Sequence, residues 1–312
     1  MDLVDRVSHR LKLRDLRLLE TVVRLKSMAK AAIQLNISQP AVSKAIAELE
    51  HVVGVRLLDR SRQGVEPTEY GRALLACGVA LFDDLRQGLR NIEFLVDPTV
   101  GEVRIGSTNP IAASFVSAVV NRIARQRPLI VFHVVTAQTD ELHRALQDRK
   151  VDLLIARRLS IAEERQSFEF LFEDLHVVAA GVQNPLVRRR RFKLCDLMGE
   201  SWVLPPPDSP PGLIAVEAFR ASGLDYPPAT VFAVSPEVRM SMLACGRFIS
   251  IFPTSELRFS TRPPAFRALP VELPHARVPI GIITLKQRTI SPVATLFISH
   301  AREMAKPLAS RK

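Results

Sequence analysis

The chain has 312 residues, of which 47% are hydrophobic, enough for well-formed cores in two or three domains. Its three cysteines, Cys77, Cys195 and Cys245, lie far apart without CxxC spacing, which disfavours a disulfide framework or zinc site and predicts buried or partly buried free thiols. No apolar run approaches the roughly 20 residues that cross a bilayer, and the start of the chain lacks a signal-peptide core. A folded cytoplasmic protein with no membrane partner is expected.

The net charge of +11 suggests nucleic acid, but the distribution of charge does not mark where the nucleic acid binds. Residues 1 to 67 hold 12 Lys and Arg against 8 Asp and Glu, whereas residues 98 to 312 hold 28 against 19. The densest basic run is Arg188 to Arg191 with Lys193. Such a run is usually a solvated face, and a contact with DNA or another anionic partner is left open.

Three helices are predicted in the first part of the chain. Leu11 to Lys26 has amphipathic spacing, and Met28 to Leu35 makes a short second helix. Asn36 tolerates a left-handed backbone and so ends the second helix, while the Ser38 hydroxyl is placed to cap the third. The segment therefore predicts a helix-turn-helix.

The third helix has two different faces. An apolar stripe that packs inward consists of Val42, Ile46, Leu49 and Val53. Small or polar side chains suited to a major groove occupy the other face: Gln39, Pro40, Ser43, Lys44 and Ala47. An ordinary helical hairpin also has a polar face, but here two strand-like pieces follow and flank residues 60 to 64, which include Arg60 and Arg62. This wing favours a DNA-binding winged helix-turn-helix.

The segment Leu11 to Gly71 resembles the amino-terminal domain of the LysR-type transcriptional regulators, with the patterns SxxxAAxxLxxSQPAxSxxIxxLExxxGxxLxxR and TExG. The residues that carry the resemblance are Ser27, Ala31, Ala32, Leu35, Ser38, Gln39, Pro40, Ala41, Ser43, Ile46, Leu49, Glu50, Gly54, Leu57, Arg60, Thr68, Glu69 and Gly71. Lys44 stands where the family often has arginine, and Glu66 and Pro67 stand where basic or aliphatic wing residues are common. The resemblance implies a sequence-specific regulator that binds double-stranded DNA.

Two classes of DNA contact are expected from the positions around the third helix and the wing. Gln39 and Ser43 are expected to read bases, while Lys44, Ser27 and Arg60 mainly hold phosphates. The full set of expected DNA contacts is Ser27, Lys30, Ser38, Gln39, Pro40, Ser43, Lys44, Arg60 and Arg62.

Thr68 to Val96 reads as one long helix that Thr68 can cap. Apolar residues follow the mixed three-and-four spacing of a helix-helix seam: Leu74, Leu81, Leu85, Leu89, Ile92 and Val96. A helix of this length, about 40 Å, is longer than the small DNA-binding domain needs to cover its core. The family resemblance implies that it is the linker through which two chains dimerise. A homodimer or homotetramer is expected, with packing of the helix on its own domain as the alternative.

A new domain is predicted after Asp97 and Pro98, where strands and helices alternate. Strands at 103–105, 130–135 and 151–156 and helices at 111–126 and 140–148 indicate βα repeats of a mostly parallel sheet. Residues 173–181 and 282–285 are predicted to cross to a second sheet formed by 202–204, 231–235 and 248–252. Helices are expected at 213–222, 236–245 and 292–305.

This region resembles the periplasmic-binding-protein-like effector domain of the same regulators, through RALQDRKVDLLIAR, DLHVVAAGVQNPL and CGRFISIFP. The expected fold class is a mainly α winged helix-turn-helix domain plus a long linker helix, followed by an α/β two-lobed effector domain. The expected boundaries are 1–67 for the DNA-binding domain, 68–97 for the linker helix and 98–312 for the effector domain. Lobe one spans about 101–177 and 276–305, lobe two about 178–275, and hinge strands lie near 175–181 and 269–278.

Effector-binding residues are predicted beyond the carboxyl ends of the strands, where open α/β sheets bind ligands. They are Ser107, Thr108 and Asn109 after the first strand, Thr136 and Gln138 after the second, Arg157 and Arg158 after the third, and Ser209 and Ser235 on lobe two. A capping or turn role is the alternative for each Ser, Thr or Asn. Adjacent arginines on a strand point to opposite faces, so one is expected to reach a small organic anion.

Catalysis is the competing class of function. The chain has no GxSxG, HExxH, GxxxxGKS/T or GxGxxG motif, and its seven histidines lack metal-like pair spacing, so no enzyme, cofactor or metal is expected. A neutral sugar remains the alternative effector, in line with a weaker likeness to galactose-binding-protein regulators. A small-molecule-binding module or enzyme without regulatory role is the remaining alternative, and RNA polymerase is a further candidate partner.

Overall fold

The computed structural model describes residues 10–61, 64–159, 164–191, 193–258 and 266–309. The chain divides into two compact units, Met1–Leu89 and Arg90–Lys312, and each is described by itself. No helix in the described ranges is both long and apolar enough to cross a membrane.

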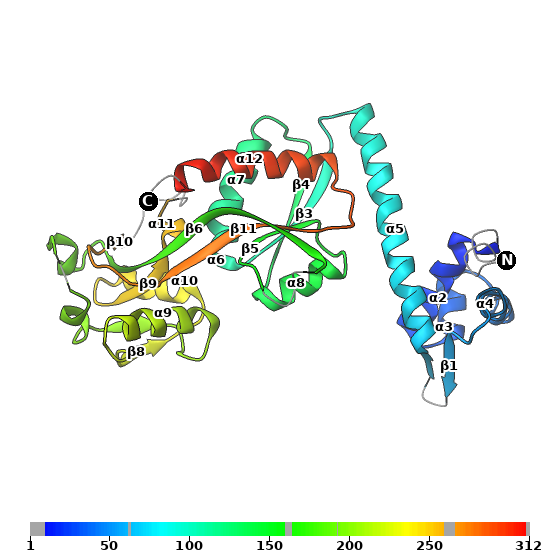
Figure 1. The fold of residues 1–312 in the computed structure, drawn as a ribbon, viewed down its shortest axis with the longest axis horizontal. Coiled ribbons are helices and arrows are strands. Elements are labelled where there is room, and N and C mark those ends of the chain that lie inside the picture. Colours follow the sequence, from blue (N-terminus) through cyan, green and yellow to red (C-terminus); the bar gives the residue numbers. More distant parts are fainter. Residues whose placement is uncertain (1–9, 62–63, 160–163, 192, 259–265, 310–312) are drawn as a thin grey trace. The chain divides into compact units, whose positions relative to one another are not determined.

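The first unit is a three-helix domain with a β-hairpin. It contains α2 (Leu13–Leu25), α3 (Met28–Leu35), α4 (Gln39–Val53), β1 (Leu58–Ser61), β2 (Gly64–Pro67) and the larger part of α5 (Glu69–Val96) (Figure 1). Its core joins side chains of the three helices to the hairpin, with Leu19, Val22, Ala31, Val42, Ile46 and Leu57 nearly or fully buried. The predicted winged helix-turn-helix is confirmed, because the apolar stripe of each helix meets the others in one core.

Helix α5 leaves an apolar stripe exposed. The Thr68 hydroxyl accepts a hydrogen bond from the Gly71 amide at 3.0 Å and so caps the helix as predicted. Leu74, at the start of the predicted seam, packs on the core of the first unit. The later apolar residues face solvent, with exposed fractions that rise from 39% to 83% along Leu81, Leu85, Leu89, Ile92, Leu95 and Val96.

The second unit contains one mixed sheet. Its nine described strands run in the order β4-β3-β5-β11-β6-β9-β7-β8, with β10 paired to β6. Their bounds are β3 (Gly101–Ser107), β4 (Ile130–Thr136), β5 (Leu153–Ala156), β6 (Gln166–Gly181), β7 (Trp202–Leu204), β8 (Ala229–Phe232), β9 (Ile249–Pro253), β10 (Phe266–Ala268) and β11 (Arg277–Leu285).

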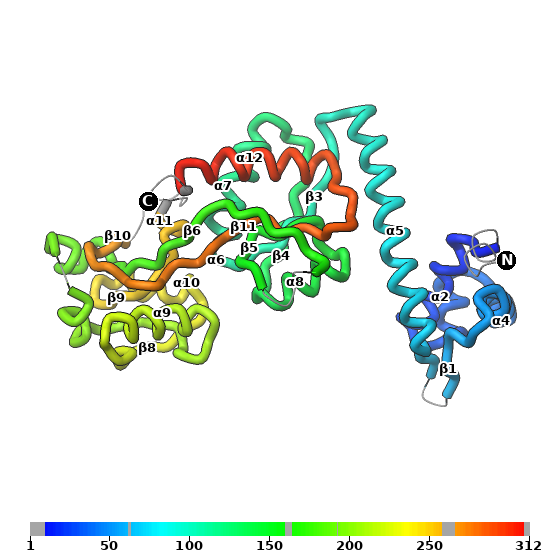
Figure 2. Tube along the Cα trace, in the orientation of Figure 1, coloured from blue at the N-terminus to red at the C-terminus, as the bar shows by residue number. Residues whose placement is uncertain are grey.

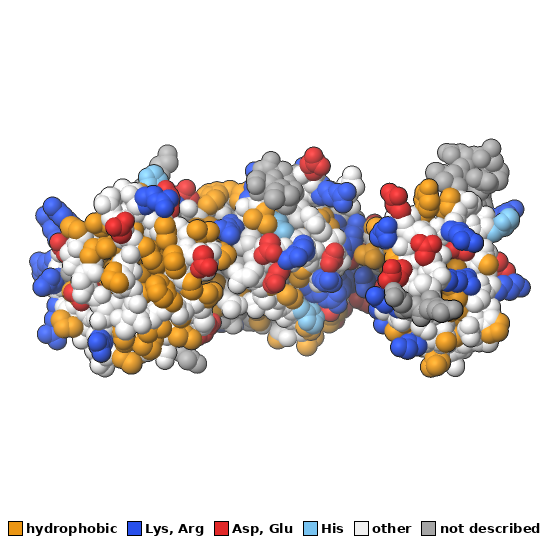
Figure 3. Space-filling view, turned by 90° about the horizontal axis from the view of Figure 1, so that it is seen from below, with side chains coloured by type: hydrophobic (Ala, Val, Ile, Leu, Met, Phe, Trp, Pro, Cys, Tyr) orange, Lys and Arg blue, Asp and Glu red, His pale blue; other side chains and the backbone are white. Residues whose placement is uncertain are grey.

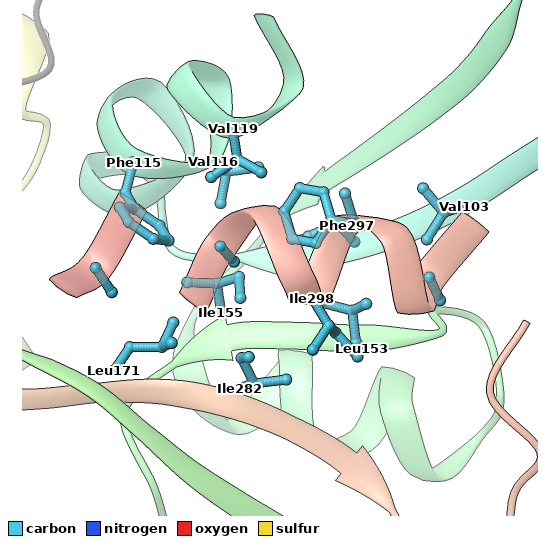
Figure 4. Packing of buried hydrophobic residues seen from close by; sticks show 14 of the residues in the cluster. Val103, Phe115, Val116, Val119, Leu153, Ile155, Leu171, Ile282, Phe297 and Ile298 are labelled. Atoms are coloured by element: carbon cyan, nitrogen blue, oxygen red, sulfur yellow. The ribbon is translucent and has the colours of Figure 1, made fainter. Parts of the chain in front are cut away.

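The first half of this sheet, with its helices, forms lobe one. The helices are α6 (Asn109–Ile111), the π-helical η1 (Ala112–Val116), α7 (Ser117–Ala124), α8 (Thr139–Gln147) and α12 (Pro292–Ala309). Helices α7 and α12 cover one face of the sheet and α8 covers the other (Figure 1). Figure 4 shows Phe297 and Ile298 of α12 among the buried side chains of α7, β5 and β11. This core holds the strand ends of lobe one in place.

Lobe two packs around Trp202, which is fully buried and donates from Nε1 to the Leu197 carbonyl at 2.9 Å. Its helices are α9 (Pro210–Ala221), α10 (Pro236–Ala244) and α11 (Thr254–Arg258), with 3-10 turns η3 (Pro185–Arg188) and η4 (Leu194–Leu197). The basic run Arg188 to Arg191 with Lys193 is exposed, and Figure 3 shows basic side chains along the outer end of this lobe. Hydrophobic side chains gather on the same face over α9 and β8.

Strands β6 and β11 cross between the lobes (Figure 2). The predicted parallel βα repeats of lobe one are confirmed, because β3 pairs in parallel with β4 and β5. The sheet as a whole is mixed, since β11 pairs antiparallel with β5 and β6, and β6 pairs antiparallel with β9 and β10. A chain that crosses to lobe two and returns must run in opposite directions through the hinge. The second hinge strand also begins later than predicted, at Arg277.

The three cysteines are free, as predicted, but exposed, so the prediction that they are buried or partly buried was wrong. Cys77 lies on the solvent side of α5, Cys195 is in the turn η4 and Cys245 caps the end of α10. Their positions on helix surfaces and ends, rather than on the apolar stripes, account for the exposure.

Candidate functional site

The turn between α3 and α4 positions the candidate DNA-binding helix. Asn36 takes the predicted left-handed backbone, with φ 54°, and its amide bonds back to the last carbonyls of α3. The Ser38 hydroxyl accepts from the Ala41 amide at 3.4 Å, which caps α4. Val42 and Ile46 of α4 are fully buried, so the opposite face of the helix turns to solvent.

Helix α4 carries four of the nine predicted DNA contacts. Gln39, Pro40 and Lys44 are exposed, and Lys44 lies 3.8 Å from the Glu48 carboxylate in a solvated pair. Ser43 is half-buried, with its hydroxyl directed to the Met28 sulfur at 3.4 Å. Gln39 and Lys44 are therefore more accessible to DNA than Ser43.

The remaining predicted DNA contacts that the structure describes lie on either side of α4 in the chain, at the starts of α3 and α4 and on the hairpin. The Ser27 hydroxyl accepts from the Lys30 amide at 3.3 Å and caps α3, while the Lys30 side chain is exposed. Arg60 is exposed on β1, opposite Val65 in the hairpin register. Arg62 lies outside the described residues.

Glu50 of α4 and Gly71 of α5 both contact the chain at Leu57, just before the hairpin, in ways that spacing did not predict. The Glu50 carboxylate accepts from the amides of Leu57 and Leu58 at 2.8 and 3.2 Å. Gly71 lies so close to the hairpin that a Cβ would be 2.0 Å from the Leu57 carbonyl oxygen. Both residues belong to the family pattern, and these contacts give the physical reason.

A cavity of about 350 Å³ lies in the second unit, between the strand ends of lobe one, the helix starts of lobe two and the crossing strands. Six predicted effector residues line it: Thr108, Asn109, Thr136, Gln138, Arg157 and Ser235. The apolar lining is Pro110, Ile111, Ala137, Pro210, Pro211, Ile214, Val234, Pro236, Pro253, Val278 and Ile280. This size is at the lower end of ligand pockets.

Three predicted residues lie elsewhere. Ser107 is fully buried and its hydroxyl donates to the Ile155 carbonyl at 2.7 Å. Arg158 is exposed, with its guanidinium 5.8 Å from the ring centre of Phe168. Ser209 caps α9, since its hydroxyl accepts from the Gly212 amide at 3.2 Å. Packing, the strand pleat and capping take these three side chains away from the cavity lining.

Arg157 is the one Lys or Arg in the described lining of the cavity. Its Nε donates to the Thr139 hydroxyl at 3.3 Å, and its carbonyl oxygen is 3.2 Å from His143 Nε2. The guanidinium is thereby oriented from one side, and no acidic side chain of the described residues forms an ion pair with it. An oriented cation without an acid partner is suited to bind an anion.

The floor of the cavity contains two titratable residues of β6. They were not predicted, because they do not lie at the carboxyl end of a strand. Asp174 accepts from the Ser255 amide and hydroxyl at 3.0 and 2.6 Å and from the Thr254 hydroxyl at 3.2 Å. Burial lowers the pKa of His176, with Asp174 acting in the opposite direction, so the imidazole is neutral near pH 7. The floor therefore supplies a satisfied carboxylate and no second cation.

No cluster of His, Cys, Asp or Glu in the described part of the chain is arranged to hold a metal ion. The chemistry available at the cavity is binding by hydroxyls, side-chain amides, one guanidinium, one imidazole and apolar surface, with the carboxylates of Glu141 and Asp174 also in the lining.

Comparison with known proteins identifies the two halves of the chain. A family model described as bacterial regulatory helix-turn-helix protein, lysR family, matches residues 13–72, and one described as LysR substrate binding domain matches residues 97–306. The chain is 27% identical over 297 residues to the HTH-type transcriptional regulator GbpR of Azospirillum brasilense, covering 94% of this chain and 86% of GbpR. It is 26% identical over 305 residues to PcaQ of Agrobacterium fabrum, covering 96% of each.

Solved structures share the fold. A full-length OxyR variant from Pseudomonas aeruginosa gives a TM-score of 0.67 at 19% identity, over 97% of this chain and 99% of that one. Full-length CbnR complexed with its target DNA gives 0.55 at 20% identity, over 95% and 100%.

Proposed function

The chain belongs to the LysR family of bacterial transcriptional regulators, and on that premise we propose that its effector is a small organic anion whose carboxylate binds Arg157. It is a DNA-binding regulator with an effector-binding domain, and not an enzyme. The observation that carries the proposal is the oriented guanidinium of Arg157 in a cavity whose described lining has no other Lys or Arg. Guanidinium pairs with carboxylate through two parallel hydrogen bonds.

The polar side chains of lobe one complement this pair. The hydroxyls of Thr108 and Thr136 line the same cavity, and Asn109 adds an amide beside them. A carboxylate bound to Arg157 has lone pairs left to accept from such donors. A neutral sugar needs no cation, so dependence of binding on Arg157 separates the two effector classes.

Arg157→Gln is expected to weaken carboxylate binding by on the order of 1.5–3 kcal/mol, or roughly 10- to 150-fold, because it removes one partner of a charge-assisted pair. Arg158→Gln is the matched control, since Arg158 carries the same charge one residue later but does not line the cavity. Calorimetric titration of full-length protein with carboxylates and sugars measures both. Sugar binding that neither variant changes would reject the anion and favour the alternative effector.

We assign DNA recognition to the exposed face of α4 and to the wing, with Gln39 and Ser43 reading bases and Lys44, Ser27 and Arg60 holding phosphates. The support is positional: Gln39 lies at the exposed start of α4, and Arg60 lies on the exposed hairpin. Lys30, Ser38 and Pro40 border the same surface, and Arg62 is included from the sequence alone.

Gln39→Ala is expected to cost about 1–3 kcal/mol on specific DNA and to relax preference at one base pair, because a base-edge contact is lost. Arg60→Ala is expected to weaken specific and random DNA alike and to reduce the slope of log K against log salt by about one, because one phosphate contact is lost. Fluorescence anisotropy on both DNAs at several salt concentrations measures these effects. Equal losses on both DNAs for the two variants would contradict the assignment.

We propose that α5 dimerises the chain and carries the effector response to the DNA-binding units. Arg90, near its end, pairs with the carboxylate of Glu102 on β3 and lies 3.8 Å from Asp152, which precedes β5. A movement of this sheet on effector binding would therefore be transmitted to α5. We also propose that the protein is a cytoplasmic homodimer or homotetramer, with RNA polymerase as a further candidate partner.

A further inference from the structure

We infer that the effector is a monocarboxylate with an apolar body, which binds with its carboxylate on lobe one and its body against lobe two. This inference rests on the proposed binding of a carboxylate by Arg157. It adds that the two walls of the cavity differ in chemistry, and that the difference selects for a single anionic group.

The lobe-two wall offers an incoming ligand almost no hydrogen-bond donor. Helix α9 starts with Pro210 and Pro211, which have no amide hydrogen, and the next amide, from Gly212, donates to Ser209. Helix α10 starts with Pro236, and the Ser235 hydroxyl accepts from the Val238 amide. Two helix starts that would ordinarily attract an anion are therefore largely blocked by proline and by capping.

The polar groups of this wall already have partners. The Ser235 hydroxyl donates to the Glu237 carboxylate at 2.6 Å. The surface that this wall presents to the cavity is therefore apolar and consists of Pro210, Pro211, Ile214, Val234 and Pro236. A sugar ring or a second carboxylate on this side would lose its water without gaining partners.

The floor also gives no support to a second anionic group. The Asp174 carboxylate already accepts three hydrogen bonds, and burial keeps the pKa of His176 below its ordinary value. Val278 and Ile280 of β11 continue the apolar surface from the floor. The one cationic group of the described lining is thus at lobe one, and hydrocarbon surface lies across from it.

Binding measured by calorimetry on the full-length protein tests this with a straight-chain series from butanoate to octanoate and the matched diacids. Affinity for the monoacids is expected to rise about fourfold per methylene until the cavity is filled. Each diacid is expected to bind at least about tenfold more weakly than the monoacid of the same length, because its second carboxylate meets proline and isoleucine.

Ile214→Lys is expected to reverse the preference between hexanedioate and hexanoate, because it places a cation on the apolar wall. Leu213→Lys is the matched control, since Leu213 adjoins it on α9 but is 58% exposed and does not line the cavity. Leu213→Lys should keep the wild-type preference.

The outcomes separate the two proposals. Diacids that bind wild-type protein as tightly as monoacids, with both losing affinity in Arg157→Gln, would overturn the apolar-body inference and leave the proposed function standing. Binding of no acid, or acid binding that Arg157→Gln does not change, would overturn both.

Discussion

Leu85→Glu in α5 is expected to convert the protein to monomers and to lower its affinity for a two-half-site DNA by on the order of 100-fold or more, because the second half-site contact is lost. Leu85 is 46% exposed and belongs to the apolar stripe with Leu81, Leu89 and Ile92. The opposite side of the same helix buries the polar side chains of Asp83 and Gln87. A helix that exposes its apolar stripe in the single chain is suited to pair with a second copy, where a buried carboxylate would have no partner.

Sedimentation velocity and DNA binding of the full-length protein measure this effect. Ala76→Glu is the matched control, because Ala76 is exposed and nine residues, about two and a half turns, put it on the opposite side of α5. The control is expected to remain dimeric. A Leu85→Glu variant that still sediments as a full dimer would place the dimer contact outside this stripe.

The DNA-binding half of the fold was predictable because its signals are local. Asn36, Ser38 and Thr68 each end or cap a helix through contacts within a few residues, and the structure has these contacts where the sequence predicts them. The apolar spacing of α4 likewise selects the buried face of one continuous helix. For Glu50 and Gly71 the sequence showed only that they belong to the family pattern. Their structural role could not be predicted, because both contact the chain at Leu57, which lies outside their own helices.

The cavity was only partly predictable because it combines local and distant contacts. Thr108, Thr136 and Arg157 could be predicted because each lies at the carboxyl end of a parallel strand of lobe one or directly after it. Asp174 and His176 could not be predicted, because they enter the cavity from the middle of a crossing strand whose direction the sequence does not reveal.

The apolar wall was hidden for another reason. In sequence, Pro236 is an ordinary first residue of the helix predicted at 236–245, and Pro210 and Pro211 precede the helix predicted at 213–222. Their effect on ligand choice depends on both helix starts facing the same cavity, which only the folded chain shows. Which of Arg157 and Arg158 enters the cavity also depends on the folded chain. The strand pleat predicts that the two side chains point in opposite directions, but the sequence does not say which one points into the cavity.

Glu256→Gln is expected to remove a loss of stability that the wild-type protein suffers as the pH rises. Glu256 of α11 is 6% exposed, and neither carboxylate oxygen has a hydrogen-bond partner among the described residues. Burial raises the pKa of Glu256 to about 8, with Asp174 and Glu237 acting in the same direction and Arg239 against them. The folded chain therefore keeps a proton that the unfolded chain loses near its ordinary pKa of 4.5.

Folding thus takes up a proton between about pH 4.5 and pH 8, so the free energy of unfolding falls through this range as the pH rises. The shift corresponds to an upper limit of roughly 5 kcal/mol. Urea denaturation of Glu256→Gln should show stability close to that of wild type at acidic pH and a growing advantage toward alkaline pH. His176 titrates in both proteins, so the difference between them isolates Glu256.

Glu169→Gln supplies the control for this comparison, because Glu169 is not among the groups that shift the pKa of Glu256. A hydrogen bond from Arg302 lowers the pKa of Glu169, so its contribution is present above its ordinary value of 4.5 and is lost only as the pH falls further. Its stability difference from wild type should stay constant over the range in which the Glu256→Gln difference grows. A constant difference for Glu256→Gln as well would mean that Glu256 is already ionised in the folded chain at acidic pH, with Arg239 compensating its charge.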